Sequence, residues 1–348
     1  MLEQEETRGG FPMYDVICVG SSTVDVFART NFSQLIKICD PRGEHDLLAY
    51  PCGTKIIIDD LNMTVGGGGT NTTVALARLG HKVAYLGKMG THTNSKRIIE
   101  LLQKENVDTS LVVRTKNGRT GYSIILDSIE HDRTILTFKG SNNDLRFSEI
   151  PKKKLRTKWF YFASMMEEAY GTLEKLALYA KKNNIGIMFN PSSYLCRKGL
   201  DYLRTLLKQT DILALNREEA EMLLGTQDNS PDRHALLYGL HTLGPSLVII
   251  TDGKKGTYLY TAEEHAIYRL TPRKIKPVET TGAGDAFGST FLSGWMRTHD
   301  ARHSLHIAQI NAESEIMHPG VKNKLLTTRQ MAVMLKTYKV KITRKKAP

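Results

Sequence analysis

The sequence predicts an α/β protein in which helices cover both faces of a mainly parallel central sheet, so that the chain forms three layers. One observation is that short apolar segments rich in β-branched and aromatic residues alternate with segments of helical periodicity. A second is that Gly80, Gly225 and Gly244 stand where the carboxyl ends of helices are expected. Because most of these strands are followed by a helix, most neighbouring strands are expected to run parallel.

Each predicted element follows from its local pattern. The predicted strands are short runs of Val, Ile, Leu, Phe and Tyr, at 14–20, 82–90, 159–163, 186–190, 211–216, 246–251 and 256–261. The predicted helices carry apolar residues three and four positions apart, at 72–80, 94–106, 172–183, 199–209 and 218–225.

Two stretches, 55–65 and 119–139, depart from this alternation and read as strands and hairpins without helices between them. We expect them to form a small antiparallel sheet that projects from the body, either as a lid over a site or as a surface for a homodimer. Residues 28–54 are interpreted as the root of this lid. No internal repeat or low-complexity linker is found, so residues 1–348 are predicted to form a single domain.

The composition is that of an ordinary globular protein. Of the 348 residues 41% are hydrophobic and 24% are charged, and no apolar run reaches the roughly 18 residues of a membrane span. The amino-terminal MLEQEETRGG is acidic and polar, which is not the pattern of a secretory signal. The four cysteines show no CxxC pair. We therefore expect a reduced, cytoplasmic protein with no membrane partner.

The formal net charge of +12 is concentrated in two short segments. Residues 151–158 and a predicted basic tail, 336–348, contain 11 Lys and Arg residues and no acid. A basic charge that follows neither a groove nor a helix face is more typical of solvated surface than of nucleic-acid binding. A nucleic-acid partner such as RNA is therefore the weaker interpretation.

The segment TTGAGDAFGSTF (280–291) carries the strongest chemical signal. Gly282 and Gly284 leave backbone amides uncovered at the start of a predicted helix, which makes an anion site. Asp285 beside such a site could accept the proton of an attacking hydroxyl while the amides hold a transferring phosphoryl group. Neither a GxxxxGK[ST] loop nor a dinucleotide fingerprint occurs in the chain.

Other motifs place this segment in a known order. VGSSTVDVF (19–27) puts Asp25 after the first strand, and GGGGTNTTVALARLG (66–80) supplies a second glycine cluster before a helix. NREE (216–219) and TDGKKG (251–256) follow, and TTGAGDAF comes last. From about residue 14 to 328 the order resembles that of the ribokinase-like (PfkB-type) carbohydrate kinases.

The resemblance implies roles for particular residues. Asp285 would be the general base, and the amides of Gly282, Ala283 and Gly284 would form the anion hole. The remaining positions implied to bind substrates are, for the acceptor, Asp25, Gly67, Gly68 and Asn71, and for the nucleotide, Asn216, Glu219, Thr251, Gly253, Gly256 and Asn311. Glu219 would order Mg²⁺ through water. A monovalent cation such as K⁺ near 279–285 is also implied, although Glu279 replaces the usual Asp of the family.

These inferences predict an ATP- and Mg²⁺-dependent kinase that phosphorylates a hydroxyl of a sugar. A nucleoside kinase of the same fold is an alternative, with Tyr122, Phe138 or Phe32 as a platform for the base. The third glycine of GGGG (66–69) replaces a side chain common in ribokinase, so ribose itself is not specified. An alternative of another class is a non-catalytic protein that binds sugar or nucleotide, which would have no need of Asp285.

Overall fold

The computed structural model describes residues 12–40, 43–127, 133–226, 232–318 and 322–347. Its centre is a nine-stranded sheet with the order β17-β16-β15-β14-β13-β12-β11-β1-β6. The strands from β14 to β6 pair in parallel, and β14 to β17 pair antiparallel. The bounds are β1 Tyr14–Val19, β6 Val83–Leu86, β11 Thr157–Ala163, β12 Gly186–Asn190, β13 Ile212–Asn216, β14 Leu247–Thr251, β15 Thr257–Thr261, β16 Ala266–Thr271 and β17 Lys341–Lys346.

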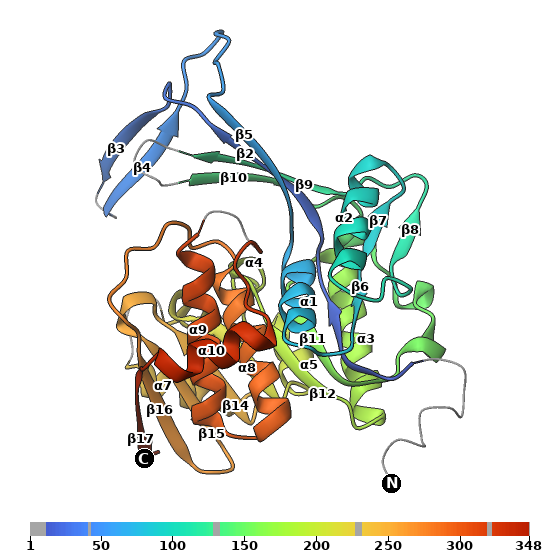
Figure 1. Cartoon of the computed structure of the whole chain (residues 1–348), viewed down its shortest axis with the longest axis vertical. Coiled ribbons are helices and arrows are strands. Elements are labelled where there is room, and N and C mark those ends of the chain that lie inside the picture. Colours follow the sequence, from blue (N-terminus) through green and yellow to red (C-terminus); the bar gives the residue numbers. More distant parts are fainter. Residues whose placement is uncertain (1–11, 41–42, 128–132, 227–231, 319–321, 348) are drawn as a thin grey trace.

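Helices cover both faces of this sheet, so the predicted three-layer α/β arrangement is confirmed (Figure 1). One face packs against α1 Gly68–Arg78, α2 Thr93–Lys104, α8 Ala283–Thr298 and α9 Ala301–Ile316. The other packs against α3 Glu167–Lys182, α4 Ser193–Cys196, α5 Gly199–Leu207, α6 Arg217–Leu224 and α7 Arg233–His241. Helix α10 Thr328–Thr337 packs outside α9. Short 3₁₀ turns lie at Gly140–Asp144, Phe147–Glu149, Lys152–Lys154 and Gly253–Lys255.

Strand β1 illustrates why the central strands are apolar throughout. Val16 and Cys18 belong to the core under α1 and α8, whereas Ile17 and Val19 belong to the core under α3 and α6. Successive side chains of a strand point to opposite faces, so a strand with helices on both sides buries every residue. The predicted strand 82–90 is split, because β6 stays in the central sheet while β7 Lys88–Gly90 pairs with β8 Val113–Thr115.

A separate four-stranded sheet, the lid, projects from the body with the order β10-β9-β2-β5 (Figure 1). Its strands are β2 Thr23–Arg29, β5 Asp60–Gly66, β9 Gly121–Asp127 and β10 Arg133–Phe138. Lid strands lie within both predicted stretches, but the first stretch is a strand only from residue 60, because its partner β2 ends at Arg29. The expectation of an antiparallel sheet is wrong at its centre, where β2 pairs in parallel with β9. Between β2 and β5, the segment interpreted as a lid root contains a separate hairpin, β3 Gln34–Asp40 and β4 Gly43–Ala49.

The prediction of a basic tail at 336–348 is wrong. Residues 336 and 337 end α10, and Lys341–Lys346 form β17, the edge strand of the central sheet, paired antiparallel with β16. Ile342 packs on the core while most other side chains of this strand are exposed. Lysines on an exposed edge strand discourage pairing with another chain, which gives this charge a structural reason. In the described part of the chain, no helix combines the length and the apolarity of a membrane span.

Candidate active site

The carboxyl ends of the parallel strands border two adjoining pockets. The smaller, of about 340 Å³, is lined by the last residues of β11, β12 and β13, which are Ala163, Asn190 and Asn216. The larger, of about 800 Å³, is mostly apolar and lies between β14 and α9. Both pockets are lined by Thr251, Gly284 and Phe287, so the first turn of α8 lies between them. Clefts at this edge are where open α/β sheets bind their ligands.

Helix α8 begins with the backbone geometry that an anion site needs. Gly282 is its N-cap, with a left-handed φ of 85° that a side chain would oppose. Among the described residues, no hydrogen bond is recorded for the amides of Gly282 and Gly284. The amide of Ala283, which was expected to contribute, instead donates to the carbonyl of Thr280 at 3.3 Å. The positive end of the helix dipole and the amides on either side of Ala283 remain available to an anion.

Asp285 lies in the first turn of α8 and faces the smaller pocket. Its Oδ2 accepts a hydrogen bond of 2.7 Å from Nδ2 of Asn71. Its Oδ1 faces Gly68, where an added Cβ would lie 3.5 Å away. Burial raises the pKa of this carboxyl to about 6, although the bond from Asn71 and the charge of Lys322 both lower it. A carboxylate with a pKa in this range is suited to accept a proton near neutral pH.

Asp25 reaches the site from β2 of the lid, and its side chain is buried. Among the described residues, its Oδ1 is buried without a hydrogen-bond partner. A buried carboxylate oxygen without a donor is costly, so a bound hydroxyl would stabilise this arrangement. A Cβ at Gly66 would lie 1.7 Å from Oδ2 of Asp25, which explains the need for glycine there.

The rest of the glycine cluster lets helix α1 approach the end of β1. Gly67, the N-cap of α1, has a φ of 96°, and a Cβ there would lie 2.5 Å from the carbonyl oxygen of Ser21. A Cβ at Gly69 would lie 2.6 Å from the carbonyl carbon of Gly20. This close backbone approach places Asn71, in the first turn of α1, against Asp285.

Asn216 and Glu219 form a capping box at the start of α6. The Asn216 side chain accepts from the Glu219 amide at 2.8 Å, and the Glu219 side chain accepts from the Asn216 amide at 3.0 Å. The other oxygen of Glu219 accepts from the hydroxyl of Ser193 at 3.2 Å. Burial raises the pKa of this carboxyl. Both residues line the smaller pocket, so the cap places polar atoms beside the anion site.

Comparison with known families matches residues 15–328 to the pfkB family carbohydrate kinase. This match covers most of the chain. The chain belongs to the pfkB family. It is 26% identical to a ribokinase of Staphylococcus aureus over 285 residues, which are 80% of this chain and 88% of that one. The structure of Arabidopsis thaliana ribokinase with ribose and ATP has a TM-score of 0.77 and 18% identity, covering 94% of this chain and all of that one. A structure of an Escherichia coli protein assigned as ribokinase II, in complex with ATP and Mg²⁺, has a TM-score of 0.77 and 17% identity, and it covers 94% of this chain and all of that one.

Only some of the residues expected to bind nucleotide line the larger pocket of this pfkB carbohydrate kinase. Thr251 and Gly253 line it. Gly256 does not, because it shapes the turn into β15, where a Cβ would lie 2.3 Å from the carbonyl oxygen of Leu270. Asn311 is fully buried beneath α8, donating to Thr290 and accepting from the amide of Leu326. The expectation that the Asn311 side chain binds the nucleotide is therefore corrected.

The motifs of the pfkB family led to the correct helix but not to the residues that face this pocket. On α9 those residues are Gln309, Ala312, Glu313 and Ile316. They were missed because polar and small residues occur on every side of helix α9 (301–316), so the sequence does not show which side faces a pocket. Only the packing of α9 on α8 decides which side is buried.

Two lysines of the kinase were also missed. Lys139 follows β10 and lines the smaller pocket, and burial lowers the pKa of its ammonium group. Lys322 follows α9 and is 7% exposed, with its Nζ bonded to Asn71. Neither belongs to a motif, and a lysine in a loop ordinarily lies in solvent. No signal in the sequence alone distinguishes these two from the many exposed lysines.

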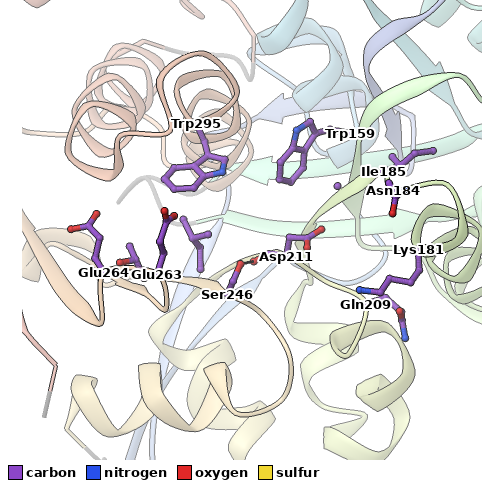
Figure 2. Close-up of a pocket in the computed structure, with 13 residues that line it drawn as sticks. Trp159, Lys181, Asn184, Ile185, Gln209, Asp211, Ser246, Glu263, Glu264 and Trp295 are labelled. Carbon is purple, nitrogen blue, oxygen red and sulfur yellow. Dashed lines mark hydrogen bonds between the residues drawn. The ribbon is translucent and has the colours of Figure 1, made fainter.

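A further pocket of about 420 Å³ lies at the opposite edge of the sheet of this kinase (Figure 2). Trp159 and Trp295 stand over it, and Asp211 and Ser246 line it just before β13 and β14 begin. These are the amino ends of the parallel strands, so the pocket is remote from the first turn of α8. It contains none of the motif residues and is not the active site.

Proposed function

We propose that residues 1–348 act as a single ATP-dependent kinase domain that transfers the γ-phosphoryl group of ATP to a hydroxyl of a sugar. The observation that supports this most directly is the place of Asp285, in the helix turn that separates the two pockets. One pocket is mostly apolar and roomy enough for a nucleoside, and the other has a more polar lining that includes Lys139, whose charge interacts with that of Asp25. A base at their junction would have the phosphoryl donor, ATP, on one side and the acceptor sugar on the other.

In the proposed reaction, the acceptor hydroxyl lies against Asp25 and gives its proton to Oδ1 of Asp285. The other oxygen of Asp285 is already occupied by Asn71, so Oδ1 is the oxygen left to act as base. The free amides at the start of α8 stabilise the charge of the phosphoryl group as it moves. Closure of the lid over the acceptor excludes water, which would otherwise compete as the acceptor.

Glu219 and Asn216 are the residues that would hold Mg²⁺, and their chemistry fits an indirect contact. Both oxygens of Glu219 already accept hydrogen bonds from the protein, so a bridging water fits better than direct ligation. No cluster of three or more ligating side chains occurs in the described part of the chain. Held through water by Glu219 and Asn216, Mg²⁺ would supply positive charge that neutralises the donor phosphates.

The lid favours a sugar over a nucleoside as acceptor. Strand register places Asp25 beside Ser123 and Thr137 on one face of the lid. Tyr122 and Phe138, which the nucleoside alternative needs as a platform, lie on the opposite face because adjacent residues of a strand alternate. Hydroxyl side chains beside a carboxylate suit a polar acceptor.

The proposal is tested by measuring ATP consumption against pentoses, hexoses, sugar phosphates and nucleosides. We expect turnover with one class of sugar. Turnover confined to nucleosides would replace the sugar proposal with the nucleoside alternative. If ATP binds but no acceptor in the panel is phosphorylated, the non-catalytic binding protein becomes the better interpretation.

We also propose a monovalent cation such as K⁺ between Glu279 and Glu315. Both carboxylates are buried, and the oxygens of Glu315 have no hydrogen-bond partner among the described residues. Burial, with a smaller contribution from the charge of Glu279, raises the pKa of Glu315 to about 7 even though the nearby charge of Lys322 lowers it. A cation would neutralise this repulsion. We expect turnover several-fold higher in KCl than in tetramethylammonium chloride of equal ionic strength; equal rates would contradict a cation site.

A homodimer through the outer face of the lid is a further part of the proposal. Leu61, Met63, Ile124 and Leu136 share this face, opposite Asp25, and all four are exposed. A contiguous apolar face of this kind is typical of an interface. Sedimentation velocity should show a dimer that Leu136→Lys dissociates, whereas Val333→Lys, an equally exposed site on α10, should leave it intact. A wild-type monomer at micromolar concentration would contradict the interface.

A cytoplasmic location is proposed as well. Cys18, Cys39, Cys52 and Cys196 are all free thiols, as expected in a reducing compartment. Cell fractionation would test this location.

A further inference from the structure

Lys322 places a buried ammonium group directly behind the two aspartates of the site. Its Nζ donates to Oδ1 of Asn71 and to the carbonyl oxygen of Val65. Asp25 and Asp285 both interact with its charge. A lysine is seldom buried to this extent unless a charge or a hydrogen bond compensates. These contacts link the segment after α9 to helix α1 and to the lid.

The hydrogen bonds of Asn71 can be satisfied in only one orientation of its amide. The ammonium of Lys322 can only donate, and the ionised carboxylate of Asp285 can only accept. Oδ1 of Asn71 must therefore face Lys322, and Nδ2 must face Asp285, as the structure has them. If the amide were rotated by 180°, Nδ2 of Asn71 would face the ammonium of Lys322, which is also a donor. Oδ1 of Asn71 would then face the carboxylate of Asp285, which is also an acceptor.

This orientation determines which oxygen of Asp285 is free. Because Nδ2 of Asn71 holds Oδ2, the other oxygen, Oδ1, is directed toward Gly68 and the smaller pocket. Without Lys322, the amide of Asn71 could turn and present an oxygen to the carboxylate. The carboxylate would then lose its donor and rotate away from the acceptor.

We propose that Lys322 is a positioning residue for the general base: through Asn71 it orients Asp285, and its charge keeps that carboxylate ionised. The inference rests on the proposed function, because it assigns Lys322 a part in the reaction of the same site. Lys322 touches neither the phosphoryl group nor the reacting hydroxyl in this scheme. It acts on the base alone, so the binding of ATP is independent of it.

The surrounding charges determine the direction of the pH effect. Lys322 is faced by Asp25, Asp285 and Glu315, which raise its pKa, and by Arg78, which lowers it. Burial outweighs these and lowers the pKa of Lys322 to about 8, so it is charged at neutral pH. Asp285 is faced by Lys322, Asn71 and Tyr161. Removing the positive charge raises the pKa of Asp285 further, and the base is then protonated at a higher pH.

The test compares Lys322→Met, Lys322→Gln and Lys324→Met by the pH dependence of kcat. In Lys322→Met we expect the acid limb, near pH 6 in the wild type, to move up by about one pH unit, which by itself lowers kcat at pH 7 by about twofold. The lost orientation of Asp285 should bring the total decrease in kcat to about tenfold, with KM for ATP unchanged. Lys322→Gln can still donate to Asn71, so it should shift the limb but retain kcat at high pH. Lys324 is exposed in the same segment, and its variant is the matched control for loss of charge.

A second set of measurements separates positioning from a general loss of structure. The double variant Asn71→Ala/Lys322→Met should have almost the same kcat as Lys322→Met alone, because both changes break the same contacts from Lys322 through Asn71 to Asp285. A drop in kcat that is equal at every pH, with no shift of the acid limb, would overturn the proposal.

The ionisation of Asp285 can also be followed without turnover. In protein labelled at the aspartate carboxyl carbon, the signal that Asp285→Asn removes reports the titration of this group by ¹³C NMR. We expect a midpoint near pH 6 in the wild type and a higher one in Lys322→Met. If the shift occurs but no acceptor is phosphorylated, the proposed function fails while the effect of Lys322 stands. An identical midpoint in both proteins refutes the role of Lys322.

Discussion

Replacing Asp285 by asparagine is expected to lower kcat by about 10²–10⁴-fold, the usual contribution of a general base. Asparagine has nearly the same shape, and its carbonyl oxygen can still accept the bond from Nδ2 of Asn71. It cannot take the proton of the acceptor. KM for ATP should change little, because the amides at the start of α8 are unaffected. Steady-state kinetics with the acceptor identified in the panel would measure both constants.

The pH dependence and stability of the same variant provide controls. Wild-type activity should fall as the pH decreases through about 6, because Asp285 must be ionised to act. The folded pKa lies above the unfolded value of about 3.9, so ionising this group between those values destabilises the fold. Asp285→Asn should therefore be at least as stable as the wild type at pH 7. Asp60→Asn, the same change at an exposed residue of the lid, is the matched control. Wild-type turnover in Asp285→Asn would refute the mechanism.

Replacing Gly69 by alanine is expected to lower the free energy of unfolding by about 3 kcal/mol, at the upper end of the range for overpacked sites. The added Cβ would lie 2.6 Å from the carbonyl carbon of Gly20, a backbone atom that cannot rotate away as a side chain could. Helix α1 would have to move away from β1, which also breaks the 3.0 Å bond from the Gly69 amide to Ser21. Asn71 moves with the helix, so activity should fall as well. Urea unfolding and kinetics measure the two effects.

Gly171→Ala provides the matched control for this change. Gly171 lies in α3, and a Cβ there meets nothing within 4 Å. Alanine is the better helix former, so this variant should be more stable than the wild type by about 0.5–1 kcal/mol. If Gly69→Ala proved as stable as Gly171→Ala, the proposed backbone contact between α1 and β1 would be wrong.

Much of the central fold could be predicted because its signals are local. The strands of the parallel sheet are apolar at successive positions, as in β1, where both faces are buried. The segment 280–291 likewise specifies its own turn and helix start, because Gly282 alone tolerates the left-handed geometry there. The lid was placed correctly since alternating segments need no distant partner to be recognised.

Other predictions failed where the outcome depends on a partner distant in the sequence. Residues 55–59 are rich in isoleucine, but β2 ends before it can pair with them. Residues 341–346 have the charge of a tail, yet β16 offers an edge on which they complete the sheet. Tyr122 and Phe138 are aromatic residues of the lid, but the strand register turns them away from Asp25.

The sequence by itself determined the three-layer α/β fold, the family and the acid in the first turn of α8. Each of these is encoded in contiguous residues whose backbone preferences and periodicity act locally. Only the tertiary structure decided that Asn311 is a buried support and that Lys322 stands behind the base. Lys322 lies 251 positions from Asn71 in the sequence, and its burial follows from packing α1, α9 and the lid together. Such contacts arise from three-dimensional packing, which no local pattern records.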